Sequence, residues 1–559
     1  MNVGSWWASL FDQARRNLNA VKNARSWELP TAKAPRSSLS GIGSVVHPVF
    51  NGEHPEWLAE SEANEFWAEP LGLFNSTEKM NATEVLKRTI HEVLSTAIFQ
   101  MPVKGGWRKF IYAPDLSSGV AGWLRYLQQQ GDPKGKIQQF EQVCDRILDE
   151  FSWTSNAAEE YWGIPWIDRS NSQWRNKNPR LINAGWLIEE YKTDNKEEKK
   201  EQLKQIKQSI QQTFEEGDNP TDWYVIAAGD GDNMSKWLEG DKHLMKPYGA
   251  YISDDLSPKI EKLDDSMKQP FQEFLEQTKR MSPSTHSALS RALLDFSNQL
   301  VPYLTEQRYA GRLIYGGGDD VLAYTNLWEW DKWLWDIRQC FRGDKDPLKD
   351  QPEYKDNPEF TDYFKSEGDY WSWQGGKENV NLSARPLFTM GSNATISFGI
   401  VIAHHSVPLA IALESMWEAE KEAKEHKSPN GDQKDAVQVR VIYSNGNTLK
   451  ATCKFKTFNH WQVLLAVTKV EPAIFEQAAT VWEQHPAPEG AISAWGVAFC
   501  DRREKLTDNK KEFCKVLTQF LEKLWNTTQE KDRDREVQNW LKLAAFMLRK
   551  REINIGGAS

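Results

Sequence analysis

Two acidic motifs, each at the end of a predicted strand, constrain this chain more than any other feature. The first follows a short apolar run, Trp223 to Gly229, and reads Asp230-Gly231-Asp232-Asn233. The second, Gly316-Gly317-Gly318-Asp319-Asp320, joins two short apolar segments at 312–315 and 321–325. A tight glycine-rich joint between apolar runs indicates a β-hairpin. The chain must therefore place carboxylates both at a strand end and at a hairpin tip.

The elements around these motifs follow the order of a known α+β fold. A helix over 287–304 separates the two motifs, and a polar insertion at about 342–386 follows the hairpin. Further along, the pattern predicts a strand, a helix and a last strand, at 396–403, 408–426 and 437–443. The order β-α-β-β-α-β is that of a ferredoxin-like palm or cyclase domain.

Helical regions flank the predicted palm. The chain has 559 residues, too many for one hydrophobic core. We expect a mainly helical region at 1–220, a palm at 221–455 and a helical domain at 456–559. The first region ends in a charged helix at 196–216, and an apolar stripe marks the last helix. The stripe residues are Leu203, Ile206, Ile210 and Phe214 in the first helix, and Val537, Trp540, Leu541, Ala544 and Leu548 in the last.

The acidic residues suggest metal chemistry. In a ferredoxin-like sheet the strands that carry the two motifs are neighbours, so their carboxylates converge and repel one another unless cations neutralise them. Hard divalent ions such as Mg²⁺ or Mn²⁺ take oxygen ligands, and two of them can activate a hydroxyl and stabilise leaving pyrophosphate. The predicted metal ligands are Asp230, Asp232, Asp319 and Asp320, and the predicted catalytic residues are Asp230, Asp319 and Asp320.

Other residues beside the acidic motifs suit a nucleotide. Gly317 and Gly318 let the backbone approach a ligand closely. Asn233, Met234 and Ser235, at the turn into a helix, can offer backbone N–H groups to a triphosphate. Each motif alone is weak, because a Gly-Gly-Asp-Asp hairpin is often only a turn, and Asp-Gly-Asp-Asn is often a loop or half of a calcium site. Their joint occurrence at strand ends in palm order favours a nucleotide site.

Composition restricts the remaining function classes. A formal net charge of −10 argues against indiscriminate coating of nucleic acid. The five cysteines form no CxxC pair, and no stretch of 18 apolar residues occurs, which predicts a cytoplasmic protein without disulfides. The 26 tryptophans can stack on RNA bases, but packing inside helical domains is the favoured interpretation.

Two neighbouring histidines are candidate metal ligands. His404 and His405 end a predicted strand beside the palm, but the sequence near them offers no partner at a metal-binding spacing. Packing at the strand end, or exposure to solvent, is therefore favoured for both.

Four segments resemble the large subunit of type III CRISPR effector complexes, the Cas-ten family, in its Cmr branch. They read DWYVIAAGDGDNMSKWL, SALSRALLDFSNQL, GRLIYGGGDDVLAY and ISFGIVIAHHSVPLAIALESMWEAEKEAK, and the resemblance covers about 222–443. It implies that the palm, on binding of target RNA by the complex, converts ATP into cyclic oligoadenylate. It also implies that Ser290 and Arg291 flank the nucleotide and that Lys424 contacts the triphosphate. Other Cmr subunits, guide RNA and target RNA are the implied partners.

The chain also departs from the family pattern. Relatives begin with an HD nuclease domain and a first palm, whereas this sequence has no His-Asp dipeptide and no legible earlier palm. The loop at 37–41 has serines where relatives may carry zinc-binding cysteines. Two alternatives stay open, an inactive palm that serves as a scaffold and a free-standing enzyme similar to diguanylate cyclases. The latter usually have Phe after the second acidic residue of the hairpin, where this chain has Val321.

Overall fold

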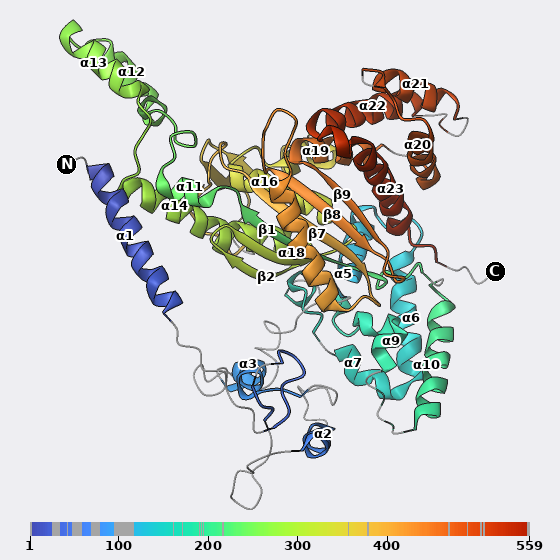
Figure 1. Ribbon diagram of the computed structural model, residues 1–559. Helices are drawn as coiled ribbons and strands as arrows, with labels where there is room; N and C mark the ends of the chain where they lie inside the picture. Colours follow the sequence, from blue (N-terminus) through green and yellow to red (C-terminus); the bar gives the residue numbers. More distant parts are fainter. Residues whose placement is uncertain are drawn as a thin grey trace, which may run out of the picture. The chain divides into compact units, whose positions relative to one another are not determined.

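The protein is described here by a computed structural model (Figure 1). The residues that the structure describes are 3–24, 34–41, 43–46, 59–68, 79–93, 117–159, 161–169, 172–188, 191, 193, 195–214, 217–355, 357–376, 380–467, 470–488, 490–503, 506 and 509–555. Within these ranges, no helix combines the length and the apolar character needed to cross a membrane. All five cysteines have free thiols, as expected.

The chain divides into two compact units, 9–112 and 113–559, the second of which also includes residues 1–8. The smaller unit contains α2 (Glu60–Ala68) and α3 (Ala82–Val93), and α1 (Val3–Asn23) begins before it. In the smaller unit the Ser37 hydroxyl donates a 2.6 Å hydrogen bond to Glu84, and the Trp67 indole donates one of 3.0 Å to the carbonyl of Val46. The three domains expected from the sequence stay a prediction, with both palm boundaries inside the larger unit.

A six-stranded sheet forms the centre of the larger unit, in the order β2-β3-β1-β7-β8-β9. β1 is antiparallel to both β3 and β7, whereas β7 and β8 are parallel. Its strands are β1 (Trp223–Gly231), β2 (Arg312–Gly317), β3 (Asp320–Thr325), β7 (Ile396–His404), β8 (Ala436–Ile442) and β9 (Thr448–Lys454).

The ferredoxin-like order is confirmed, but one of its helices was assigned wrongly. The motif consists of β1, α14 (Pro283–Asp295), β2, β3, α16 (Trp330–Arg342) and β7. The sequence interpretation used the later helix α18 (Leu409–Glu425) as the second helix, although α18 connects β7 to the added strand β8. It also missed β9, whose outer residues are exposed and polar.

The two faces of the sheet carry different layers (Figure 1). Alternate residues of β1 point to opposite faces, as a strand requires. Tyr224, Ile226 and Ala228 form one small core with Ala412 and Met416 of α18. The intervening Val225 and Ala227 belong to the large core on the other face, which also receives α16 and the C-terminal helices. β1 is thus buried on both sides, which explains its uniformly apolar sequence.

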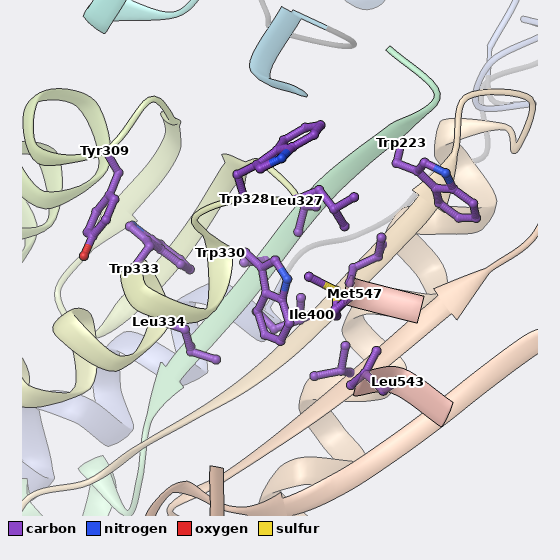
Figure 2. Close-up of a cluster of buried hydrophobic side chains, with 14 of the residues drawn as sticks. Trp223, Tyr309, Leu327, Trp328, Trp330, Trp333, Leu334, Ile400, Leu543 and Met547 are labelled. Atoms are coloured by element: carbon purple, nitrogen blue, oxygen red, sulfur yellow. The ribbon is translucent and has the colours of Figure 1, made fainter. Parts of the chain in front are cut away.

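Tryptophans dominate the large core (Figure 2). Trp330 and Trp333 of α16 are fully buried, and Trp330 packs against Trp461 with ring centroids 5.9 Å apart. The Trp540 indole donates a 3.0 Å hydrogen bond to the carbonyl of Thr452 at the edge strand β9. These tryptophans are packing residues, as the sequence favoured, so they are not available to stack on RNA bases.

The insertion after α16 is more ordered than its polar sequence indicates. It contains a separate three-stranded antiparallel sheet of β4 (Phe364–Ser366), β5 (Tyr370–Trp373) and β6 (Leu387–Phe388). Arg385 docks it against α14 through a bidentate ion pair with Asp295 at 2.6 and 2.8 Å. The insertion therefore braces the helix that precedes the acidic hairpin.

Helices account for the rest of the larger unit. The described parts of both flanking regions are helical. The predicted apolar stripes of α10 (Lys196–Gln211) and α23 (Arg533–Arg551) face the core, and Leu203 and Leu548 are partly buried. The remaining α-helices are α5 (Ser117–Gln129), α6 (Lys136–Glu150), α7 (Ser155–Glu159), α8 (Pro165–Asp168), α9 (Ala184–Leu187), α10 (Lys196–Gln211), α11 (Met234–Glu239), α12 (Ser257–Ile260), α13 (Asp265–Glu276), α15 (Val301–Tyr303), α17 (Pro352–Lys355), α19 (Phe455–Leu465), α20 (Pro472–Gln484), α21 (Ile492–Asp501), α22 (Lys510–Thr527) and α23 (Arg533–Arg551).

Candidate metal and nucleotide site

The β2–β3 hairpin presents its acidic pair through a very short turn. Gly317 pairs with Asp320, so only Gly318 and Asp319 lie between the strands. Gly318 has a φ of 69°, a left-handed conformation that glycine adopts without the cost that a Cβ would add. The turn leaves Asp319 half-buried and Asp320 exposed at the edge of the sheet.

The end of β1 lies close beside this turn because β1 pairs with β3, where Gly229 faces Val321. A Cβ built on Gly231 would lie 2.8 Å from the Cβ of Asp319 and 2.7 Å from its Oδ2. No side chain fits at position 231 without moving Asp319. The glycine between the two acidic residues of the first motif therefore has a steric role, which is to admit the hairpin carboxylate.

Asp230 accepts hydrogen bonds from both Asp319 and Asp320. Burial, followed by the negative charge of Asp230, raises the pKa of Asp319 to about 6. The hydrogen bond to Asp230, followed by burial, raises the pKa of Asp320 to about 7. Burial also acts to raise the pKa of Asp230, but hydrogen bonds from Asp320 and Lys424 outweigh it and hold that pKa below its usual value.

Lys424 of α18 is the cation that the structure places in this cluster. Its ammonium group contacts Asp230 and forms a 2.7 Å ion pair with Glu420 one helical turn earlier. Burial acts to lower the pKa of Lys424, but the bonds to Asp230 and Glu420 prevail and raise it. The residue implied as a triphosphate contact is therefore at the acidic site, in contact with a carboxylate.

Asp232, in contrast, has a different environment from that expected of a metal ligand. It is 1% exposed, and the hydroxyls of Thr395 and Ser397 donate hydrogen bonds of 2.7 and 2.9 Å to its two oxygens. The backbone N–H of Asp435 donates a third, of 3.0 Å. These bonds tie the end of β1 to β7 and to the start of β8. A metal-ligand role for Asp232 stays a prediction, and its hydrogen bonds show a role in holding the strands together.

The other nucleotide-binding candidates lie on two helices. Asn233, with a φ of 59°, begins the short helix α11, and Met234 lies beside Gly231. Ser290 and Arg291 are exposed on α14, where Arg291 forms a 3.4 Å ion pair with Asp295. Asp295 also holds Arg385, so this contact belongs to the docking of the insertion. A nucleotide role for these residues, and for Gly317, stays a prediction.

Sequence reasoning missed Glu420 and the partners of Asp232. Glu420 precedes Lys424 by four residues on a helix, a spacing that pairs opposite charges and could have identified it. Thr395 and Ser397 gave no such signal, because their approach to Asp232 depends on the pairing of β1 with β7.

The arrangement suits oxygen-seeking divalent ions. Asp230, Asp319 and Asp320 supply carboxylate oxygens at one edge of the sheet, and the charge of Lys424 offsets part of their mutual repulsion. Mg²⁺ and Mn²⁺ prefer such ligands and leave room for phosphate oxygens. These residues therefore fit the ions predicted from the sequence.

Comparison with known proteins finds relatives of the palm region. A ferredoxin-like sheet that brings a strand-end aspartate against an acidic hairpin defines a palm domain. A family profile described as "Cas10/Cmr2, second palm domain" matches residues 224–355. A Cmr subunit Cmr2 of the CRISPR system of Pyrococcus furiosus is 27% identical over 238 residues, which are 43% of this chain and 20% of that protein. Both matches support the resemblance of this chain to the Cas10/Cmr2 family, the Cas-ten family, in its Cmr branch.

Two solved structures share the fold. A type III-B Cmr-beta complex in the apo state contains a chain that matches with a TM-score of 0.52 and 13% identity. A Cmr-beta complex bound to cognate target RNA contains one with a TM-score of 0.50 and 12% identity. The matches cover 97% and 99% of this chain but 60% and 63% of those chains. This chain therefore spans less than two thirds of the length of these relatives.

Proposed function

We propose that this chain acts in a type III-B Cmr effector complex and that its palm converts ATP into cyclic oligoadenylate. The convergence of Asp230, Asp319 and Asp320 at one edge of the sheet carries the proposal. A structural role does not account for it, because carboxylates that share protons at an exposed edge add little stability. A cation-dependent reaction does account for it.

The residues divide the work by their positions. Two Mg²⁺ or Mn²⁺ ions, when bound, would activate the attacking hydroxyl and stabilise the leaving pyrophosphate. Asp230, Asp319 and Asp320 would hold them, and Gly231 keeps Asp319 close to β1. Lys424 contacts Asp230, and its pKa is raised, so its ammonium group stays charged. The same group can leave Asp230 and bind a phosphate oxygen instead. Gly318 adds no side chain at the turn and leaves the backbone open to a nucleotide.

Membership of a complex rests on the relatives. The Pyrococcus furiosus protein is named as a Cmr subunit, and the two solved structures are Cmr-beta complexes, one with target RNA. We extend this to the present chain, whose helical flanks would dock other Cmr subunits and sense guide and target RNA in the cytoplasm. Such coupling requires that RNA bind the active arrangement more tightly than the resting one.

The test is product formation by the assembled complex. We expect cyclic oligoadenylate from ATP and Mn²⁺ when target RNA is present, detected by mass spectrometry. Asp319→Ala with Asp320→Ala should abolish it while the complex still assembles. Asp264→Ala with Asp265→Ala is the matched control, because this second Asp-Asp pair is exposed at the start of α13. Unchanged product from the hairpin variant would overturn the mechanism.

The same experiment separates the two alternatives. An inactive scaffold would assemble with its partners but yield no product under any condition. A free-standing cyclase would make product at full rate as a lone chain, indifferent to RNA, and would accept GTP. We favour the RNA-dependent enzyme because the three carboxylates are intact and because the proteins that are similar to this chain belong to Cmr complexes.

A further inference from the structure

A second group of metal-binding side chains lies at the opposite end of β1. His404 pairs in register with Trp223, so the end of β7 lies beside the residue that precedes β1, which is Asp222. One ligand atom from each of Asp222, His404 and His405 lies within 4.8 Å of the other two. The sequence offered no third ligand near the two histidines, and the pairing of β1 with β7 supplies it.

The local backbone holds these side chains in place. The N–H of His405 donates a 2.8 Å hydrogen bond to the carbonyl of Asp222, and the N–H of Asn219 donates one of 3.1 Å to the Asp222 carboxylate. The strand ends at His404 and the chain turns at His405, so consecutive imidazoles can lie on one side, with ring centroids 4.3 Å apart. Trp223 packs edge-on against His404 at 5.3 Å. These contacts hold the Asp222 carboxylate, the His404 ring and the backbone of His405 at one end of the β1–β7 pair.

Ser406 holds the imidazole of His404 in its orientation. Nδ1 of His404 and the hydroxyl of Ser406 are 2.8 Å apart. Ser406 contacts this ring twice, because its backbone N–H also donates a 3.3 Å hydrogen bond to Nδ1 of His404.

We propose that Asp222, His404 and His405 bind a divalent transition-metal ion, with Zn²⁺ as the preferred occupant. Two imidazoles and one carboxylate form a ligand set of the kind that Zn²⁺ uses with a fourth position left to water. The imidazoles distinguish this site from the oxygen-only cluster of the palm, which suits Mg²⁺ and Mn²⁺. Nine residues of β1 separate the two sites by about 25 Å, so they fill independently.

The surroundings define how the ion would behave. His405 is exposed, and it lines a cavity of about 470 Å³ together with Ser406, Tyr224 and Tyr324. The ion would therefore be open to solvent and exchangeable by a chelator. Its three ligands come from both sides of the β1–β7 pair, so binding would clamp the two strands together and raise the melting temperature.

The test is Zn²⁺ binding by the full-length chain after removal of metals with a chelator. Competition with a chromophoric chelator should reveal one Zn²⁺ that survives Asp319→Ala with Asp320→Ala. His405→Ala and Asp222→Asn should each weaken the binding of that ion at least about 10-fold. Asp222→Asn keeps an oxygen for the N–H of Asn219. His485→Ala, an exposed histidine after α20, is the matched control and should bind as the wild type does.

Melting curves distinguish a variant that has lost the metal site from one that has lost its fold. The variants should melt as the wild type does in chelator, and only the wild type and the controls should gain stability from added Zn²⁺. Co²⁺ should give visible absorption bands in the wild type that are lost in His405→Ala. Equal Zn²⁺ binding by the wild type and the ligand variants would overturn the proposal, as would Zn²⁺ bound only at the acidic cluster.

Discussion

Gly231→Ala tests the link between local sterics and activity most sharply. The new Cβ would meet the Cβ of Asp319 at 2.8 Å and the Cγ of Met234 at 3.1 Å. Ordinary carbon contacts are about 3.5–4.0 Å, so Asp319 must retreat by more than about half an ångström. Displacements on the order of 1 Å at a reacting centre cost about 100-fold in rate. We therefore expect activity to fall by about 10- to 100-fold.

The same substitution should disturb stability far less than activity. Gly231 has no positive φ, so alanine suits its backbone and lowers the entropy of the unfolded chain. Crowding of Asp319 opposes this gain, and the free energy of unfolding should change by less than about 2 kcal/mol. Gly376→Ala is the control, because a Cβ at Gly376 meets nothing within 4 Å.

The assay for Gly231→Ala combines two readings. Mn²⁺ titration followed by electron paramagnetic resonance measures ion affinity, and product formation from ATP measures turnover. We expect both to fall in Gly231→Ala and neither to fall in Gly376→Ala. Wild-type affinity and turnover in Gly231→Ala would refute the argument that this glycine admits the hairpin carboxylate.

Three further substitutions test other parts of the structure. Arg308→Leu leaves two buried aspartates without their shared partner and should cost about 3–5 kcal/mol in urea unfolding, whereas an unchanged midpoint would contradict the buried network. Lys424→Met should raise the KM for ATP about 10-fold without weakening Mn²⁺ binding. The control is Lys421→Met, at an exposed lysine of the same helix, which should leave the KM unchanged. Equal effects of the two substitutions on the KM would exclude a phosphate contact by Lys424. Burial raises the pKa of Glu536 to about 7 in the folded chain, so the folded state binds the extra proton and wild-type stability should fall as pH rises from about 4.5 to 7. Glu536→Gln should remove this loss of stability, so the variant should exceed the melting temperature of the wild type by more at pH 8 than at pH 5. A difference in melting temperature that does not change with pH would contradict the assignment.

The sequence predicted those parts of the fold that local pattern determines. Trp223 to Gly229 is apolar at every position because β1 is buried on both faces, and the glycine-rich joint before Asp319 is a hairpin. The strand neighbours followed from the ferredoxin-like order. Helix α16 was not predicted, although its apolar residues have helical spacing. They are Trp330, Trp333, Leu334, Ile337 and Phe341.

What could not be predicted depends on contacts between distant segments. Asp232 seemed equivalent to Asp230 in sequence, but Thr395 and Ser397 of the β7 region capture its oxygens. The sequence around Asp222 does not indicate metal binding, because its proximity to His404 depends on the register of β1 and β7. In both cases the local sequence specifies the residue, and only the strand pairing specifies its partner.

The most direct test of the central claim is to locate Mn²⁺ by anomalous diffraction, in crystals of the protein grown with Mn²⁺ and a non-hydrolysable ATP analogue. We predict two manganese peaks bounded by Asp230, Asp319 and Asp320, with the triphosphate beside them and Lys424 released from Asp230. Manganese elsewhere, or an Asp230–Lys424 contact that persists with no ion at the hairpin, would contradict the assignment of this edge of the sheet as a nucleotide-polymerising site.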